Sequence, residues 1–240
     1  MTKPAMPKAM VLAAGLGTRM RPLTEHLPKP LIQVAGVPLI DRALDWLTAA
    51  GIEEAVVNSH HHAEKLEAHL AARQSPRILL SPETEVLETG GGIFHALPLL
   101  GDLFFVVNSD VICIDGPSPA LHRLLAAWDD SAMDALLLVH PVEQAVGYHE
   151  QGDFFVENGH IRRRLDHPRA PFVFTGVQLM HRRLFRHAPG GKFSLNVLYN
   201  HGMQSNGTLP RIRALAHDGA WLHVGDPQGL REAEAWLAQH

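Results

Sequence analysis

The sequence predicts an α/β fold in which a mostly parallel central sheet is covered by helices on both faces, in a Rossmann-like arrangement. Over the first 140 residues, short apolar runs alternate with amphipathic segments, which is the pattern of strand–helix–strand units. The composition is that of an ordinary soluble globular protein, with 46% hydrophobic and 19% charged residues. No stretch rich in Pro, Gly or Ser divides the 240 residues, so we expect one domain spanning residues 1–240.

The first half supplies five expected strands and four expected helices. The strands are short apolar runs and cover residues 9–13, 54–58, 77–80, 103–108 and 135–140. The helices carry apolar residues at helical spacing and cover residues 39–50, 63–72, 89–97 and 119–128. Thr89 is a good N-cap for the third helix. In such sheets ligands bind beyond the carboxyl ends of the strands, so functional residues are expected there.

After residue 150 the pattern changes to that of a β-hairpin elaboration. Residues 153–156 and 160–165 flank the turn sequence Glu157-Asn158-Gly159, which predicts a hairpin. The further expected elements are a strand at 172–180, a helix at 194–204, and strands at 211–217 and 221–224. Asp226 and Pro227 then suit the N-cap and the first position of a last helix.

Charge and cysteine content exclude several classes of protein. The 21 Lys and Arg residues against 25 Asp and Glu residues give a formal net charge of -4, which argues against a nucleic-acid-binding module. A small phosphorylated ligand needs only two or three well-placed cations. The one cysteine, Cys113, excludes an internal disulfide and a cysteine-rich metal site, and we expect it to be a small buried hydrophobe.

The run His60-His61-His62 raises the question of a metal site. The other histidines lack metal-ligand spacing, so we interpret the run as a solvated loop after a strand. No apolar run approaches the ~20 residues of a spanning helix. The apolar residues 10–14 are followed at once by Gly15 and Arg19, unlike the core of a signal peptide. We expect no membrane association and a cytoplasmic location.

The strongest local signal is LAAGLGTRMRPLT at residues 12–24, followed by Pro28-Lys29-Pro30-Leu31. Its glycines let main-chain N–H groups approach a ligand closely and form a nest for an anion. Arg19 adds a guanidinium fork and Lys29 a compact positive charge, both suited to phosphate. Met20 stands where GxGxxG and GxxxxGK[ST] motifs need glycine, so this is a phosphate-binding loop of neither kind.

This run resembles the signature of the sugar-1-phosphate nucleotidylyltransferases, and the resemblance extends along almost the whole chain. The other matching segments are SPE at 81–83, LETGGGI at 87–93, NSD at 108–110, GDF at 152–154, FTGV at 174–177 and WLHVG at 221–225. It implies the nucleotidyltransferase fold and a reaction that joins a nucleoside triphosphate to a sugar 1-phosphate and releases pyrophosphate, with Mg²⁺. The short length and the LETGGGIF and QGDF segments are most similar to the uridylyltransferases that act on N-acetylmuramate 1-phosphate in peptidoglycan recycling.

The resemblance also implies roles for single residues. Those implied to contact the nucleotide are Ala13, Ala14, Gly15, Gly17, Thr18, Arg19, Lys29, Pro82, Gly90 and Asn108. Asp153 and Thr175 are implied to contact the sugar phosphate. Arg19, Lys29 and Asp110 would be catalytic, with Asp110 holding Mg²⁺ at the end of a buried strand. No general base is needed, because a sugar phosphate is largely dianionic at neutral pH, its second pKa being ~6.

Some of these residues have a purely structural alternative. Asp110 could be a turn or cap residue, residues 90–92 could serve close packing at a helix start, and Asp153 could be a hairpin-edge residue. One motif departs from the family pattern: His223 stands where Trp-x-Asp-x-Gly-Thr supplies the second metal carboxylate. We therefore expect Asp110 and the substrate phosphates to hold Mg²⁺, with His223 at the edge and Asp226 acting structurally.

Other functions also follow from the same family pattern. They are guanylyl or thymidylyl transfer to heptose, mannose or glucose 1-phosphate, cytidylyl transfer to a phosphorylated alcohol, and non-catalytic sensing of nucleotide sugars. The joint presence of Arg19, Lys29 and Asp110 argues against a sensor, since a sensor has no use for the metal carboxylate. The expected partners are therefore an NTP and a sugar 1-phosphate, and the sequence does not fix the oligomeric state.

Overall fold

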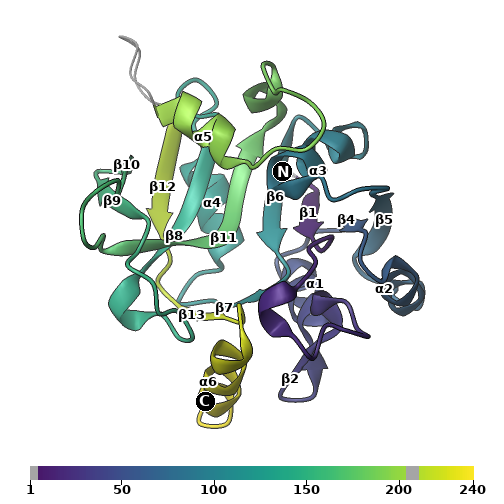
Figure 1. Cartoon of the computed structure of the whole chain (residues 1–240). Coiled ribbons are helices and arrows are strands. Elements are labelled where there is room, and N and C mark those ends of the chain that lie inside the picture. The colour runs from purple at the N-terminus through teal and green to yellow at the C-terminus, as the bar shows by residue number, and fades with distance from the viewer. Residues whose placement is uncertain (1–4, 204–210) are drawn as a thin grey trace.

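The centre of the computed structural model, which describes residues 5–203 and 211–240, is a nine-stranded sheet (Figure 1). Its strands are β1 (Ala9–Leu12), β4 (Glu54–Ser59), β5 (Arg77–Pro82), β6 (Leu103–Asn108), β8 (Ala135–Pro141), β9 (Phe154–Glu157), β10 (His160–Arg163), β11 (Phe172–His181) and β12 (Ile212–Ala216). Two short ribbons lie outside this sheet. They pair β2 (Gln33–Val34) with β3 (Val37–Pro38), and β7 (Val111–Ile114) with β13 (Ala220–His223).

The sheet is mostly parallel, as predicted. Its order is β5-β4-β1-β6-β11-β8-β12-β10-β9. β5, β4, β1 and β6 pair in parallel, as do β8 and β12, whereas β11 is antiparallel to both β6 and β8. From β5 to β12, β11 is therefore the reversed strand. The predicted hairpin β9–β10 closes the far edge, and β9 also pairs with β11.

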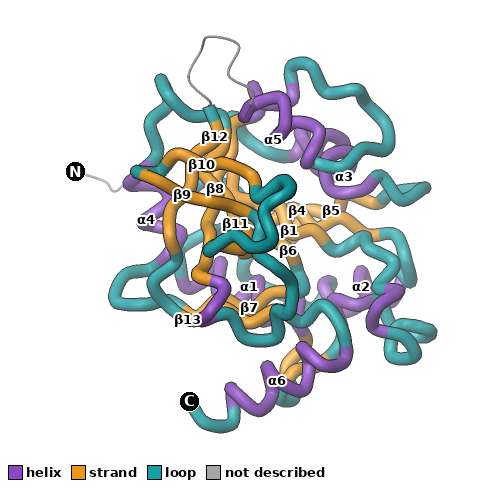
Figure 2. The backbone as a smooth tube through the Cα atoms, turned by 60° about the vertical axis from the view of Figure 1, so that its left-hand side comes forward, coloured by secondary structure: helices purple, strands orange, loops and turns teal. Residues whose placement is uncertain are grey.

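Helices cover both faces of the sheet. They are α1 (Leu39–Ala49), α2 (Ala63–Leu70), α3 (Glu88–Ala96), α4 (Ala120–Ala127), α5 (Asn196–Met203) and α6 (Pro227–Leu237). Successive side chains of β6 point to opposite faces of the sheet and so pack with different helices. Phe105 and Val107 pack with α1, α2 and α4, whereas Phe104 and Val106 pack with α3 and α5, which lie side by side in Figure 2. The predicted layer arrangement is confirmed.

The C-terminal helix α6 packs against the N-terminal loop region instead of the main sheet. Ala233 of α6 shares a buried cluster with Met20 and Leu39. Asp226 is the N-cap, as predicted, because its Oδ1 accepts hydrogen bonds from the N–H groups of Gln228 and Gly229, both at 2.9 Å. These bonds hold the pKa of Asp226 below its usual value. The cap defines the start of α6, and the cluster shared with Met20 and Leu39 holds the helix beside the predicted phosphate loop.

The predicted elements are present with shifted ends, and two details differ. The prediction of Thr89 as an N-cap was wrong, because α3 begins at Glu88 and Thr89 Oγ1 accepts a hydrogen bond from Leu195 N–H at 3.0 Å. The short strands β2, β3 and β7 were not predicted. Cys113 lies in β7, opposite Trp221 of β13, and is partly buried, so the pKa of its thiol is raised by burial.

The helix predicted at 194–204 is α5, which the structure describes from Asn196 to Met203; Gln204 lies outside the described residues. Within the described residues 5–203 and 211–240, no helix is both long enough and apolar enough to cross a membrane.

Candidate active site

A pocket of about 200 Å³ opens at the carboxyl ends of β1, β4, β5 and β6. Its lining residues come from the loops that follow these strands and from the segment around Lys29. They are Leu12, Ala13, Ala14, Gly15, Lys29, Pro30, Asn58, Glu83, Val86, Glu88, Thr89, Asn108, Ser109 and Asp110. The volume is below the ~300 Å³ of the smallest typical ligand sites, so the pocket encloses only part of a nucleotide-sized ligand. Its place is the one that open α/β sheets use for ligands.

The first wall of the pocket is the predicted phosphate loop. Ala13 N–H donates a hydrogen bond to Asn58 Oδ1 at 2.7 Å, which fixes where the loop leaves β1. Within the described part of the chain, the N–H groups of residues 14–16 have no protein acceptor, so they remain available to an anion. Gly17 has φ +62°, and a Cβ there would lie 2.8 Å from Thr24 Cγ2, so this tight turn requires glycine.

The histidine run supports this loop. His61 Nε2 and His62 Nε2 hydrogen-bond the carbonyl oxygens of Thr24 and Glu25, at 3.2 and 3.1 Å. His60 Nδ1 hydrogen-bonds the carbonyl oxygen of Glu83 at 2.9 Å. The run follows a strand as a loop, as interpreted from the sequence, but its side chains are half-buried instead of solvated. They tie the segment after the phosphate loop to β4.

Two of the predicted cations act on Asp110. Lys29 Nζ lies 2.7 Å from Asp110 Oδ2, and the two side chains are only 12% and 23% exposed. Arg19 is exposed and, among the residues that the structure describes, makes no ion pair. Burial alone would raise the pKa of Asp110, but the charges of Lys29, His223 and Arg19 hold it below its usual value. The carboxylate therefore stays ionised at neutral pH.

Asp110 lies in the turn between β6 and β7. Ser109 Oγ donates a hydrogen bond to Leu12 O at 2.7 Å, which joins this turn to the end of β1. Asp110 O accepts a hydrogen bond from Val224 N–H at 2.9 Å, which joins it to the end of β13. The residue is thus in a turn, as the structural alternative required. Its carboxylate is nevertheless directed to Lys29 and lines the pocket, so it is available to a ligand.

Asn108, the last residue of β6, is backed by a bulge in β11. The register of β11 against β8 shifts between Phe174 and Gln178. Gly176 lies within this bulge with φ +80°, and a Cβ there would lie 2.9 Å from Asn108 Cγ. Glycine therefore lets the β11 backbone press against the Asn108 side chain and hold it at the pocket wall.

Thr175 belongs to the same bulge but is not directed into the pocket. Its side chain is fully buried, and its Oγ1 donates to Leu138 O at 2.8 Å and accepts from Val177 N–H at 3.2 Å. Its carbonyl oxygen accepts a hydrogen bond from Trp221 Nε1 at 2.9 Å. The Thr175 hydroxyl therefore donates one hydrogen bond and accepts another inside the bulge. In this geometry it is not directed to a sugar phosphate, whereas the resemblance implied such a contact.

The opposite wall is a buried network that the sequence analysis did not single out. Asn58 Nδ2 donates to Glu83 Oε1 at 2.6 Å, and Glu83 Oε2 accepts from Leu87 N–H at 3.1 Å. A Cβ on Gly92 would lie 2.7 Å from Glu83 Oε1, so glycine makes room for this carboxylate beside α3. With the bond from Ala13 to Asn58, the network joins the phosphate loop, β4, β5 and α3.

Two residues implied to contact the base are placed elsewhere. The N–H groups of Gly90 and Gly91 both donate to Phe193 O at 3.0 Å, and Gly90 is buried against Phe193. The close-packing alternative therefore accounts for these glycines, and the N–H of Gly90 is not free for a base. Pro82 is exposed at the end of β5 and does not line the pocket, whereas Thr89 does.

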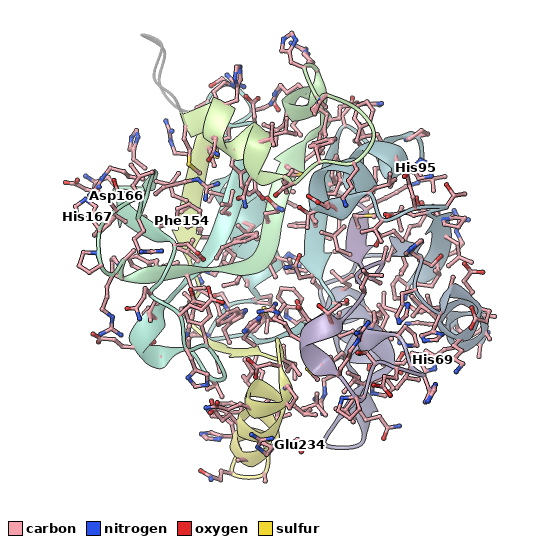
Figure 3. All side chains as sticks on the ribbon, viewed as in Figure 1. His69, His95, Phe154, Asp166, His167 and Glu234 are labelled. Atoms are coloured by element: carbon pink, nitrogen blue, oxygen red, sulfur yellow. The ribbon has the colours of Figure 1, made fainter. Side chains whose placement is uncertain are left out.

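Asp153 lies at the start of the hairpin. Its Oδ2 accepts a hydrogen bond from Phe174 N–H at 2.8 Å, two residues before Gly176. Burial raises the pKa of Asp153, although the bond from Phe174 opposes this. The next residue, Phe154, lies on the hairpin (Figure 3). Asp153 thus joins the hairpin edge to the strand that backs Asn108, which is compatible with both roles considered from the sequence.

Comparisons with known proteins identify the family. A model of the nucleotidyl transferase family matches residues 8–163. The chain belongs to this nucleotidyl transferase family. It is 46% identical over 238 residues to the N-acetylmuramate alpha-1-phosphate uridylyltransferase of Caulobacter vibrioides, covering 96% of this chain and 97% of the relative. It is 35% identical over 234 residues to the protein of the same name from Neisseria meningitidis serogroup B, covering 95% and 97%.

The fold also matches solved structures. A crystal structure of UDP-glucose pyrophosphorylase complexed with UDP-glucose superimposes with a TM-score of 0.76, at 20% identity, over 98% of this chain and 100% of the other. At this identity the match shows the shared fold. Together with the family match, it confirms the predicted nucleotidyltransferase fold.

For a nucleotidyl transferase, the residues around Asp110 fit a divalent metal with few protein ligands. The His223 ring stacks on Trp221, with a centroid separation of 5.7 Å and an interplanar angle of 9°, and packs edge-on against Tyr148. Burial lowers the pKa of His223, although Asp110 opposes this. In residues 5–203 and 211–240, no three His, Cys, Asp or Glu side chains form a metal cluster. Mg²⁺ commonly takes one or two carboxylates plus phosphate oxygens, which Asp110 suits.

Proposed function

We propose that the protein transfers a uridylyl group from UTP to N-acetylmuramate α-1-phosphate and releases pyrophosphate. The observation that carries the proposal is the Lys29–Asp110 pair, 2.7 Å apart, beside the N–H groups of residues 14–16, which have no acceptor among the described residues. This arrangement suits a bound triphosphate and a metal. The choice of base and sugar rests on two relatives that carry this activity in their names and match the chain almost from end to end.

The transfer needs positioning and charge stabilisation more than proton transfer. An oxygen of the sugar phosphate attacks the α-phosphorus of UTP, and the bond from that phosphorus to the bridging β-oxygen breaks. Pyrophosphate leaves with the electron pair. The attacking phosphate is largely dianionic at neutral pH, with a second pKa of ~6, so no side chain has to remove a proton. The N–H groups of residues 14–16, Arg19 and Lys29 would bind the negative oxygens of the triphosphate.

Asp110 would hold Mg²⁺ together with phosphate oxygens of the substrates, and the ion would reduce the negative charge around the α-phosphorus when bound. Lys29 acts on the same carboxylate, since its ammonium group keeps Asp110 ionised and fixed in direction. The further residues that we assign to the nucleotide are Ala13, Ala14, Gly15, Gly17, Thr18 and Asn108. Asp153 is assigned to the sugar side.

A pyrophosphate-release screen tests the proposed function. Each of the four NTPs is combined with 1-phosphates of N-acetylmuramate, N-acetylglucosamine, glucose, mannose and a heptose, with Mg²⁺ or with EDTA. Asp110→Asn protein purified in the same way controls for contaminating enzymes. We expect the fastest release from UTP with N-acetylmuramate 1-phosphate and none with EDTA. A 100-fold faster reaction of GTP with heptose or mannose 1-phosphate would show that the proposed substrates are wrong. No pyrophosphate release from any pair would overturn nucleotidyl transfer itself.

A further inference from the structure

Three consecutive arginines at the end of β10 have different surroundings. Arg162 is exposed, with its guanidinium 4.4 Å from the centroid of the Phe155 ring. Arg164 donates from Nε to Gly152 O at 3.0 Å and from Nη1 to His167 O at 2.9 Å, so its guanidinium ties the hairpin to the following loop. Figure 3 shows His167 at the outer side of this hairpin. These two arginines have roles within the fold or at its surface.

Arg163 is directed to the opposite face, toward α5. It is paired in register with Phe154, its guanidinium lies 5.4 Å from the centroid of that ring, and its Nη2 donates to Asn196 Oδ1 at 2.8 Å. The side chain is half-buried, and its Nε is buried without a hydrogen-bond partner in the described part of the chain. No described carboxylate lies within ion-pair distance of Arg163, whereas Arg183 and Arg211 both pair with Asp134.

A partly buried guanidinium without a carboxylate in contact is costly, because burial removes water and a more distant charge compensates only in part. Asp153 acts on Arg163 in this way at longer range, and its Oδ2 already accepts from Phe174 N–H. Asn196 offers Arg163 a neutral acceptor only. Nε is itself buried, so an anionic ligand would meet the terminal nitrogens of Arg163, of which Nη2 has a hydrogen bond among the described residues.

The position of Arg163 relative to the pocket indicates which ligand this is. The register places Arg163, Phe154 and Phe172 in one row across β10, β9 and β11. From Phe172, β11 continues to the bulge that backs Asn108 at the pocket wall. The loops of β1, β4 and β5 form the pocket on the other side of Asn108. With the nucleotide in that pocket, a sugar that extends over β11 toward the hairpin would approach Arg163.

We propose that Arg163 binds the carboxylate of the sugar substrate and so determines sugar specificity. This inference rests on the proposed function. N-acetylmuramate differs from N-acetylglucosamine by a lactyl ether group that carries a carboxylate, and a guanidinium presents two parallel N–H groups that match a carboxylate. A ring hydroxyl in the same place would leave the charge of Arg163 unpaired, so N-acetylglucosamine 1-phosphate is the poorer substrate.

The test measures kcat/KM with UTP for both sugar 1-phosphates, in the wild-type protein, Arg163→Met and the matched control Arg162→Met. Arg163→Met should lower kcat/KM for N-acetylmuramate 1-phosphate by about 10- to 100-fold, mainly through KM, as expected for a lost charged hydrogen bond. It should leave the value for N-acetylglucosamine 1-phosphate unchanged. Arg162→Met should change neither. Equal losses on both sugars, or unchanged discrimination, would overturn the inference.

A change in the substrate keeps the test independent of folding. N-acetylmuramate 1-phosphate whose carboxylate is converted to a primary amide should lose the same 10- to 100-fold with the wild-type protein, and Arg163→Met should not distinguish acid from amide. Wild-type protein that treats acid and amide alike would refute the role of Arg163. A wild-type protein that does not turn over N-acetylmuramate 1-phosphate at all would overturn the proposed function, and the inference with it.

Discussion

The buried Asn58–Glu83 network makes a strong prediction about stability. Glu83 is 7% exposed and accepts from Asn58 Nδ2 and Leu87 N–H through different oxygens. Glu83→Gln keeps the shape but places an NH₂ group against one of these two donors. Losing one charged hydrogen bond and leaving a buried donor unpaired should cost about 2–4 kcal/mol of unfolding free energy. For a chain of this size that lowers Tm by about 5–15 °C.

Urea unfolding followed by circular dichroism measures the difference, with Glu85→Gln as the matched control. Glu85 is exposed in the same loop, so its substitution also removes one negative charge but should change stability by less than about 0.5 kcal/mol. Because Asn58 also anchors Ala13 at the start of the phosphate loop, KM for UTP should rise in Glu83→Gln and not in Glu85→Gln. Equal stability of the two variants would refute the reasoning.

Three further predictions concern the charged site and one buried histidine. Lys29→Ala and Arg19→Ala should each lower kcat/KM by roughly 10²-fold or more, the ~2.7 kcal/mol scale of one lost charge-stabilising contact. Tm should change little in Arg19→Ala, because Arg19 is exposed, but should fall in Lys29→Ala, because the partly buried Asp110 carboxylate loses its ion-pair partner; near-normal turnover in both would show that the loop is not the phosphate site. Asp110→Asn should lose at least ~10²-fold in activity, on the same scale. Asp226→Asn should keep most of its activity and its Mg²⁺ requirement, because Asn also caps helices well. A collapse of kcat in folded Asp226→Asn would make Asp226 a metal ligand. Burial lowers the pKa of His140, so the folded state binds fewer protons than the unfolded state below about pH 6.5. The unfolding free energy should therefore fall as pH drops through that value. His140→Phe should reduce this fall, and an identical pH dependence in the variant would contradict the assignment.

Much of the fold could be predicted because its signals are local. Apolar runs and helical periodicity showed the strand–helix alternation, and Asp226 with Pro227 showed the start of α6. The phosphate loop was visible for the same reason, since glycines, Arg19 and Lys29 lie close together in the sequence. The ribbon of β7 and β13 was harder to predict, because its strands pair across more than 100 residues and β7 follows β6 after a two-residue turn.

Residues whose roles depend on distant partners were not predictable in this way. Asn58 and Glu83 meet because β4 and β5 are adjacent in the sheet, and the signal that could have shown them is a polar residue at the end of each strand. Gly90 and Thr175 match family motifs, but their surroundings are set by Phe193 and by the β11 bulge. A motif marked both positions, and only the packing showed what their polar groups contact.

The central claim, transfer of the α-phosphoryl group with its nucleoside, is tested most directly by following label from UTP. The wild-type protein is incubated with N-acetylmuramate 1-phosphate, Mg²⁺ and UTP labelled with ³²P at either the α- or the γ-phosphate, and the products are separated after a single turnover. We predict that all α-label appears in the uridine diphosphate sugar and all γ-label in pyrophosphate. Appearance of γ-label on the sugar would contradict nucleotidyl transfer and the roles assigned to Arg19, Lys29 and Asp110.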